Sequence, residues 1–138
     1  MTNNDNKNIA VPTTIAAWLS VQNCVKAVAF YKAAFGAIEV YRLEDPGGGL
    51  VVRLSVNGAE FWVSGTSSDN DNSDAESVGG DSIRMILTVT DPDTFFANAL
   101  KAGATEVFPV GEGHGWRLGR LIDPFGLHWE IGRPLMHN

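Results

Sequence analysis

Apolar and polar residues alternate along much of the chain with the period of two that is typical of a half-buried β-strand. In the first half, this alternation predicts four strands, over residues 14–21, 37–43, 50–56 and 59–64. Turn-forming residues separate the last three strands, and Asn57-Gly58 is the strongest short signal for a tight hairpin.

A helical spacing separates the first of these strands from the other three. Apolar residues recur at the i, i+3, i+4 and i+7 positions that seat a helix on a sheet: Ala27, Phe30, Tyr31 and Ala34. Asn23 is a suitable N-cap and Gly36 a suitable C-terminal stop, so the pattern predicts a helix over 24–35. The first half is therefore predicted to form a βαβββ unit.

The second half repeats this order of elements. Asp91 and Pro92 predict the start of a helix that stops at Gly103, among strands over 82–90, 106–110, 117–122 and 127–132. At an offset of 68 residues, four positions match between the halves: Ile15, Leu19, Ser20 and Val21 correspond to Ile83, Leu87, Thr88 and Val89. At an offset of 67, Arg53-Leu54 corresponds to Arg120-Leu121. The fold class predicted is α+β, with two βαβββ repeats.

The repeats are predicted to span residues 14–65 and 82–133, with tails at 1–13 and 134–138. The segment 66–81 is rich in Ser, Asn and Gly and contains five acidic residues but no basic residue. Such a segment buries too little apolar surface to offset its ordering entropy, so we expect a flexible linker. The net charge of the chain is −6, and most of this charge lies in the linker.

Composition excludes several classes of function. No long basic stripe is present, so we expect no nucleic-acid partner. No apolar run approaches the 18 residues of a membrane helix, so we expect no membrane partner. Cys24 is the single cysteine and cannot form an internal disulfide. The polar, Asn-rich start lacks the apolar core of a signal peptide, and a cytoplasmic location is the expectation.

Two phrases of the sequence carry a family resemblance: AFYKAAFGA at residues 29–37 and GRLIDPFGLHWEI at residues 119–131. Together with the repeated βαβββ unit, they resemble the vicinal oxygen chelate superfamily, which includes glyoxalases, bleomycin-resistance proteins and extradiol dioxygenases. The phrases are most similar to its PhnB-like branch. The resemblance implies that each unit curls its sheet into a half-barrel, that two units enclose a pocket, and that a homodimer forms.

The resemblance also identifies four positions at which metal-using members place His, Glu or Gln ligands. In this chain they hold Ala16, Trp62, Arg84 and Glu130. Only Glu130 is a usable ligand, since Arg84 is a permanent cation. A register slip of one residue does not supply better donors. We therefore predict no metal and no cofactor, and an ion pair between Arg84 and Glu130 buried in the pocket.

Strand alternation assigns a set of side chains to the predicted pocket. The ligand-binding residues expected are Trp18, Trp62, Arg84, Ile86, His114, Trp116, His128 and Glu130. No catalytic residue is assigned. On the opposite face, Ile15, Leu19, Ile83 and Leu87 should pack on the helices. Alternatives stay open: the tryptophans could be core residues, Arg84 could turn to the rim, and His114 could be a solvated loop residue.

These observations predict a metal-free, dimeric protein that binds a small organic molecule between aromatic walls. The alternative is a metal-dependent lyase, isomerase or dioxygenase of the same superfamily with an atypical site. A third possibility is a scaffold whose acidic linker contacts a partner.

Overall fold

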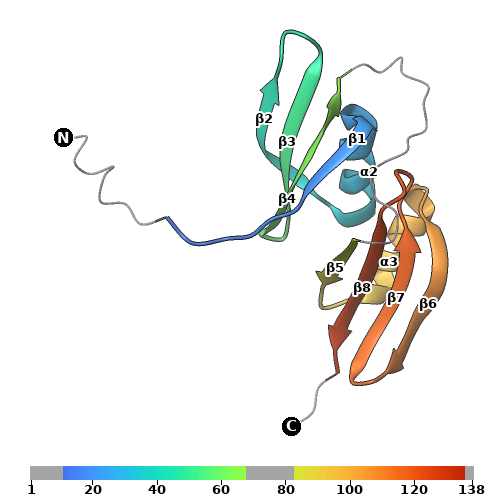
Figure 1. Ribbon diagram of the computed structural model, residues 1–138. Helices are drawn as coiled ribbons and strands as arrows, with labels where there is room; N and C mark the ends of the chain where they lie inside the picture. Colours follow the sequence, from blue (N-terminus) through green and yellow to red (C-terminus); the bar gives the residue numbers. More distant parts are fainter. Residues whose placement is uncertain (1–10, 68–82, 136–138) are drawn as a thin grey trace.

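The computed structural model describes residues 11–67 and 83–135, which form two four-stranded sheets with one helix each (Figure 1). The first sheet has the strand order β1 (Trp18–Asn23), β4 (Ala59–Thr66), β3 (Gly49–Val56), β2 (Ile38–Glu44). The second has the order β5 (Arg84–Thr88), β8 (His128–Pro134), β7 (Trp116–Ile122), β6 (Thr105–Gly113). We call residues 11–67 the first module and residues 83–135 the second module. The predicted α+β fold with two βαβββ units is confirmed.

The two modules share their strand pairing as well as their strand order. In each, the first strand runs parallel to the last strand, and the remaining pairs are antiparallel. Trp18 pairs with Trp62 in the first module, and Ile86 pairs with Glu130 in the second. Both pairs are related by the 68-residue offset seen in the sequence. Residues 68–81 of the predicted linker and parts of both tails lie outside the described residues, whereas Thr66, the first residue of that predicted linker, is the last residue of β4.

Local signals set the ends of both helices where the sequence predicts them. Helix α2 (Cys24–Phe35) begins after Asn23, whose side chain accepts a hydrogen bond from the backbone N–H of Lys26 at 3.0 Å. It ends at Gly36, whose φ of 70° favours a residue without a Cβ. Helix α3 (Pro92–Ala102) begins after the capping side chain of Asp91. Neither helix of the described residues has the length and apolarity needed to cross a bilayer.

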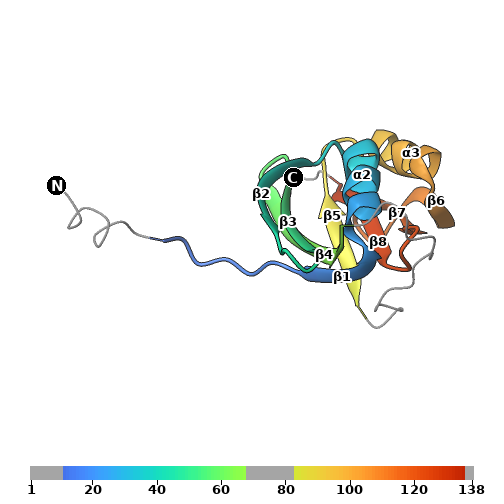
Figure 2. The ribbon, with the colours of Figure 1, turned by 90° about the horizontal axis from the view of Figure 1, so that it is seen from above.

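Each helix lies on one face of its own sheet, and the two helices contact each other (Figure 2). Leu19 and Leu87 are buried on the helix side, as alternation predicts. Ile15 and Ile83 are not: their exposed fractions are 98% and 59%. That prediction was wrong because both residues precede the paired strands, which begin at Trp18 and Arg84. The carbonyl of Ala17 still accepts a hydrogen bond from the backbone N–H of Trp62 at 2.9 Å, and the described chain at its N-terminal end leads away from the sheets (Figure 1).

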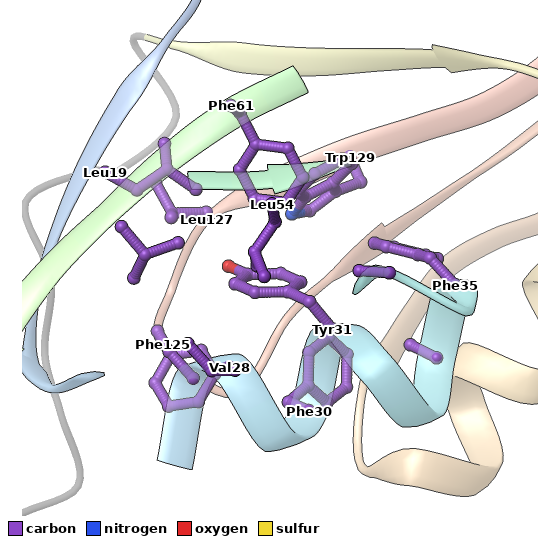
Figure 3. Packing of buried hydrophobic residues seen from close by; sticks show 14 of the residues in the cluster. Leu19, Val28, Phe30, Tyr31, Phe35, Leu54, Phe61, Phe125, Leu127 and Trp129 are labelled. Carbon is purple, nitrogen blue, oxygen red and sulfur yellow. The ribbon is translucent and has the colours of Figure 1, made fainter. Parts of the chain in front are cut away.

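An aromatic core joins the two modules around Tyr31 (Figure 3). The Tyr31 ring lies 5.3 Å from Phe61 of the first module and 5.7 Å from Trp129 of the second, measured between ring centroids. Further contacts come from Phe30, Phe35 and Phe125. Aromatic pairs at these separations add stabilisation to the area that they bury. The two modules therefore share one core.

Asp123 is a buried carboxyl at the centre of this junction. Its Oδ2 accepts hydrogen bonds from the Tyr31 hydroxyl at 2.6 Å and from the Trp129 indole N–H at 2.9 Å. Its Oδ1 accepts from the backbone N–H groups of Phe125 and Leu127 at 2.9 and 3.0 Å. Burial raises the pKa of Asp123 above its usual value, while these donors act in the opposite direction. Four donors thus converge on one side chain.

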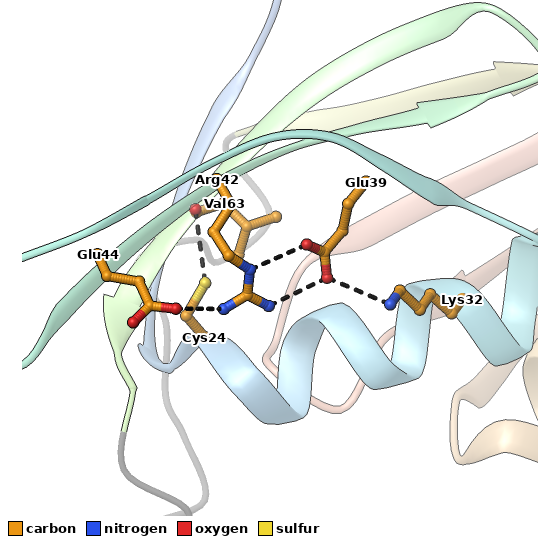
Figure 4. Close-up of polar contacts among 6 residues, drawn as sticks. All are labelled: Cys24, Lys32, Glu39, Arg42, Glu44 and Val63. Atoms are coloured by element: carbon orange, nitrogen blue, oxygen red, sulfur yellow. Dashed lines mark hydrogen bonds and ion pairs between the residues drawn. The ribbon is translucent and has the colours of Figure 1, made fainter.

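An exposed charge network connects α2 to β2 (Figure 4). Glu39 contacts Lys32 Nζ at 3.2 Å and Arg42 Nε at 3.0 Å, and Arg42 also contacts Glu44. The hydrogen bond from Arg42 lowers the pKa of Glu39.

Cys24, at the start of α2, is fully buried, and burial raises the pKa of its thiol to about 11. A reactive thiol needs a lowered pKa, so Cys24 has the properties of a core residue.

Candidate functional site

The helix-free face of the first sheet carries an aromatic platform, which consists of Trp18, Trp62 and Tyr41. The two indole rings are stacked with centroids 5.7 Å apart and planes inclined by 16°. Tyr41 meets the edge of Trp62, also at 5.7 Å. Trp18 is held by a hydrogen bond from its Nε1 to Ser64 Oγ at 2.9 Å. The exposed fraction of Trp18 is 54%, so the platform is accessible to solvent.

Arg53 lies beside this platform on β3. Its guanidinium carbon is 5.2 Å from the centroid of the Trp62 ring, a cation–π distance. Its Nε is 3.5 Å from Glu60 Oε1, so the arginine has a carboxylate as its counter-charge. Sequence reasoning did not assign Arg53, Glu60 or Tyr41 to a site. The one signal for Arg53 was its match to Arg120 in the internal repeat.

The equivalent face of the second sheet carries a polar cluster, which consists of Arg84, Glu130, Arg120 and His128. Arg84 Nη1 donates to Glu130 Oε2 at 2.6 Å, so the predicted ion pair forms. The pair is not buried as predicted, because the exposed fractions of the two side chains are 41% and 19%. Within one chain, no helix or strand of the described residues covers this face. Arg120 Nη2 lies 2.9 Å from His128 Nδ1.

Two adjoining cavities lie along the same face of the second sheet. The smaller has a volume of about 170 Å³ and is lined by Ile86, Thr88, Trp116, Leu118, Glu130 and Gly132. The larger has a volume of about 390 Å³ and shares Trp116 and Leu118 with it. His114 lines the larger cavity from the turn between β6 and β7, where its φ is 54°. A left-handed backbone at this position suits a tight turn rather than a flexible loop.

The predicted site residues therefore fall into two groups on two sheets. Trp18 and Trp62 belong to the aromatic platform of the first module. The other six lie on the second module, at the polar cluster or at the two cavities: Arg84, Ile86, His114, Trp116, His128 and Glu130. Neither sheet closes into a barrel within one chain.

The donor set of this face does not fit a divalent cation. Arg84 is 2.6 Å from Glu130, the one ligand-type residue among the four positions considered. A cation there would meet the guanidinium charge and would have to displace it from the carboxylate. Across residues 11–67 and 83–135, no three His, Cys, Asp or Glu side chains gather closely enough to hold a metal ion. We therefore derive no metal-dependent step for this chain.

Comparison with known proteins agrees with this geometry. The sequence profile of the Glyoxalase/Bleomycin resistance protein/Dioxygenase superfamily matches residues 12–131. An uncharacterized protein of Mycobacterium tuberculosis is 35% identical over 137 residues, which cover 95% of this chain and 80% of the relative. An uncharacterized protein of Arabidopsis thaliana is 34% identical over 122 residues, covering 80% of this chain and 72% of the relative.

Solved structures show the same fold. TioX from Micromonospora sp. ML1 has a TM-score of 0.66 at 24% identity, covering 89% of this chain and all (100%) of TioX. Protein PA1353 from Pseudomonas aeruginosa has a TM-score of 0.68 at 20% identity, covering 91% of this chain and 100% of PA1353. At these identities the likeness concerns the fold alone. The profile match, the relatives and the repeated βαβββ modules agree: this chain belongs to the Glyoxalase/Bleomycin resistance protein/Dioxygenase superfamily.

Proposed function

We propose that this protein binds a small organic molecule without a metal ion, in pockets that two copies of the chain form together. The observation that supports it is the exposure of functional-type side chains on both helix-free faces. The first module presents stacked indole rings, and the second presents charged and imidazole groups beside two cavities. An apolar wall with a few polar groups suits the binding of a small organic ligand.

The proposed occupant of each open face is a second copy of the chain. Large apolar side chains are exposed on both faces, and they include Trp18, Tyr41, Leu43, Ile86 and Phe108. A monomer rarely leaves such a surface open to water. In a dimer with a two-fold axis, the platform of each chain can face the polar cluster of its partner, and both open faces are covered together. Each pocket would then combine residues of both groups.

The metal-independent part of the proposal is supported by the donor set. Glu130 already pairs with Arg84, and Ala16 and Trp62 offer no donor atom suited to a divalent cation. We also place the chain in the PhnB-like branch, on the two sequence phrases described above. The PhnB protein from Bacillus cereus shares the fold, with a TM-score of 0.63 at 20% identity. The comparison covers 90% of this chain and 100% of that protein.

The dimer predicts a defined response to a charge on the open face. Light scattering coupled to size exclusion should give twice the mass of one chain for the wild-type protein. Leu43→Glu should shift the mass to that of one chain, because it places a carboxylate on an apolar surface that the second copy covers. Glu106→Gln, at an exposed position of β6, is the control and should stay dimeric. A wild-type protein with the mass of one chain at micromolar concentration would contradict the dimer.

Ligand binding predicts quenching of tryptophan fluorescence by members of a library of small aromatic and heteroaromatic compounds. For a compound that binds, Trp62→Ala should weaken binding by about ten-fold or more, because a stacked aromatic contact is lost. Ser67→Ala, at an exposed position outside the platform, should leave binding unchanged. If no compound binds, or Trp62→Ala changes stability alone, binding at the platform is ruled out.

The metal-independent part of the proposal has its own test, which is metal analysis of the purified protein. Stoichiometric zinc, nickel, iron or manganese would contradict it.

A further inference from the structure

The internal repeat places Arg53 and Arg120 at equivalent positions with different surroundings. Arg53 pairs with Trp62 across β3 and β4, and Arg120 pairs with Glu130 across β7 and β8. In the first module, Glu60 lies 3.5 Å from Arg53 and balances its charge. The position that corresponds to Glu60 in the second module is occupied by His128. Arg120 therefore lacks the counter-charge that its counterpart has.

No other carboxylate replaces this missing partner. Arg120 forms no ion pair with any carboxylate of residues 11–67 and 83–135, and Glu130, its partner across the strands, is paired with Arg84 at 2.6 Å. Its contact is with His128 Nδ1, and its Nε, like that of Arg53, is buried without a hydrogen-bond partner among those residues. An uncompensated, partly buried cation is costly, and an anion beside it removes that cost.

The contact with His128 also fixes the role of the imidazole. A guanidinium can only donate, so His128 Nδ1 is the acceptor in this contact. An imidazole brings no negative charge to the cluster. The arginines and the glutamate of the polar cluster carry two positive charges and one negative charge, which sum to one positive charge. A ligand with one negative charge would balance them.

We infer that the polar cluster is the subsite for a carboxylate group of the ligand, with Arg120 as its main contact. This inference rests on the proposed function and specifies the class of ligand as a small organic acid. The planar fork of a guanidinium matches a carboxylate, which can accept two parallel N–H bonds. Ile86 and Trp116 line the neighbouring cavity of about 170 Å³ and supply an apolar wall for the rest of such a molecule.

The test compares benzoate with benzamide, which has the same size and shape but no charge. Binding is measured by calorimetry and by tryptophan fluorescence, at constant ionic strength. The wild-type protein should bind benzoate at least about ten-fold more tightly than benzamide, since a charge-assisted hydrogen bond distinguishes the two compounds. Arg120→Gln should remove this preference, so that the variant binds benzoate and benzamide with equal affinity.

Two further variants separate an electrostatic role from a structural one. Glu130→Gln should strengthen benzoate binding several-fold, because it removes a negative charge and frees Arg84 for the ligand. A merely structural ion pair would give the opposite sign. Arg117→Gln is the matched control: Arg117 lies on the same strand but binds Asp93 at 2.6 Å, on the side of α3, and should behave as the wild type.

Equal affinity for benzoate and benzamide, no binding of benzoate, or weaker benzoate binding by Glu130→Gln would each overturn the carboxylate subsite. Neutral aromatic compounds that still quench fluorescence through Trp62 would then leave the proposed binding function standing. If no compound of either kind binds, the proposed function fails together with the subsite.

Discussion

Replacing Asp123 with alanine is expected to lower the free energy of unfolding by about 3–5 kcal/mol, because several buried donors lose their acceptor at once. The reason is the convergence of four donors on this carboxyl: the Tyr31 hydroxyl, the Trp129 indole N–H and two backbone N–H groups. Alanine leaves all four without an acceptor and away from water. Each buried unsatisfied donor costs about 1–3 kcal/mol, although such costs are not additive.

Urea denaturation followed by circular dichroism, at one protein concentration, measures this loss. Tyr31→Phe is the graded control, because it removes a single donor while the ring stays in the aromatic core, and it should cost about 1 kcal/mol. Asp123→Asn keeps one acceptor oxygen and should fall between the two. If Asp123→Ala and Tyr31→Phe are equally stable, the carboxyl does not organise the junction between the modules.

The second large effect is expected at Gly132 on β8. A Cβ at this position would lie 2.5 Å from the backbone oxygen of Arg117 and 2.5 Å from the Cβ of Leu118. Both atoms belong to the neighbouring strand β7, which pairs with Gly132 in the sheet. A backbone oxygen cannot turn aside as a flexible side chain can, so Gly132→Ala must push the two strands apart. We expect a loss of about 2–3 kcal/mol, in the range of overpacked sites.

Gly111→Ala provides the matched comparison, because a Cβ there meets no atom within 4 Å. Gly111 also lies in a strand of the second sheet. Its replacement by alanine should change the free energy of unfolding by no more than about 0.5 kcal/mol, as surface substitutions do. Thermal unfolding of both variants gives the comparison directly. Equal melting temperatures for the two alanine variants would show that β7 and β8 tolerate a side chain at their closest approach.

The sequence was sufficient for those parts of the fold that local signals specify. The caps at Asn23 and Asp91 and the stop at Gly36 predicted both helices, because each signal acts within a few residues of the helix end. Alternation predicted the buried sides of β1 and β5. It did not locate where these strands begin, since Ile15 and Ile83 continue the pattern beyond their pairing partners.

The candidate site was also predictable only in part, because its contacts join residues of different strands. The pairing of Arg84 with Glu130 followed from the family arrangement of strands, and the distance of 2.6 Å confirms the contact. The contact of Tyr41 with Trp62 depends on the pairing of β2 with β3, which a bulge interrupts and which a linear pattern does not describe. Arg53 and Trp62 are direct partners in the regular β3–β4 hairpin, so the predicted Asn57-Gly58 turn could have placed them side by side. The bond between Tyr31 and Asp123 joins residues 92 positions apart, and Asp123 alone indicates only a turn.

That bond also limits how the repeat could have arisen. Tyr31 comes from one βαβββ unit and Asp123 from the other, and the aromatic rings around them are drawn from both. One unit by itself would leave half of a core facing water. An ancestral gene that encoded a single unit would thus have needed two polypeptides to associate before fusion placed both in one chain.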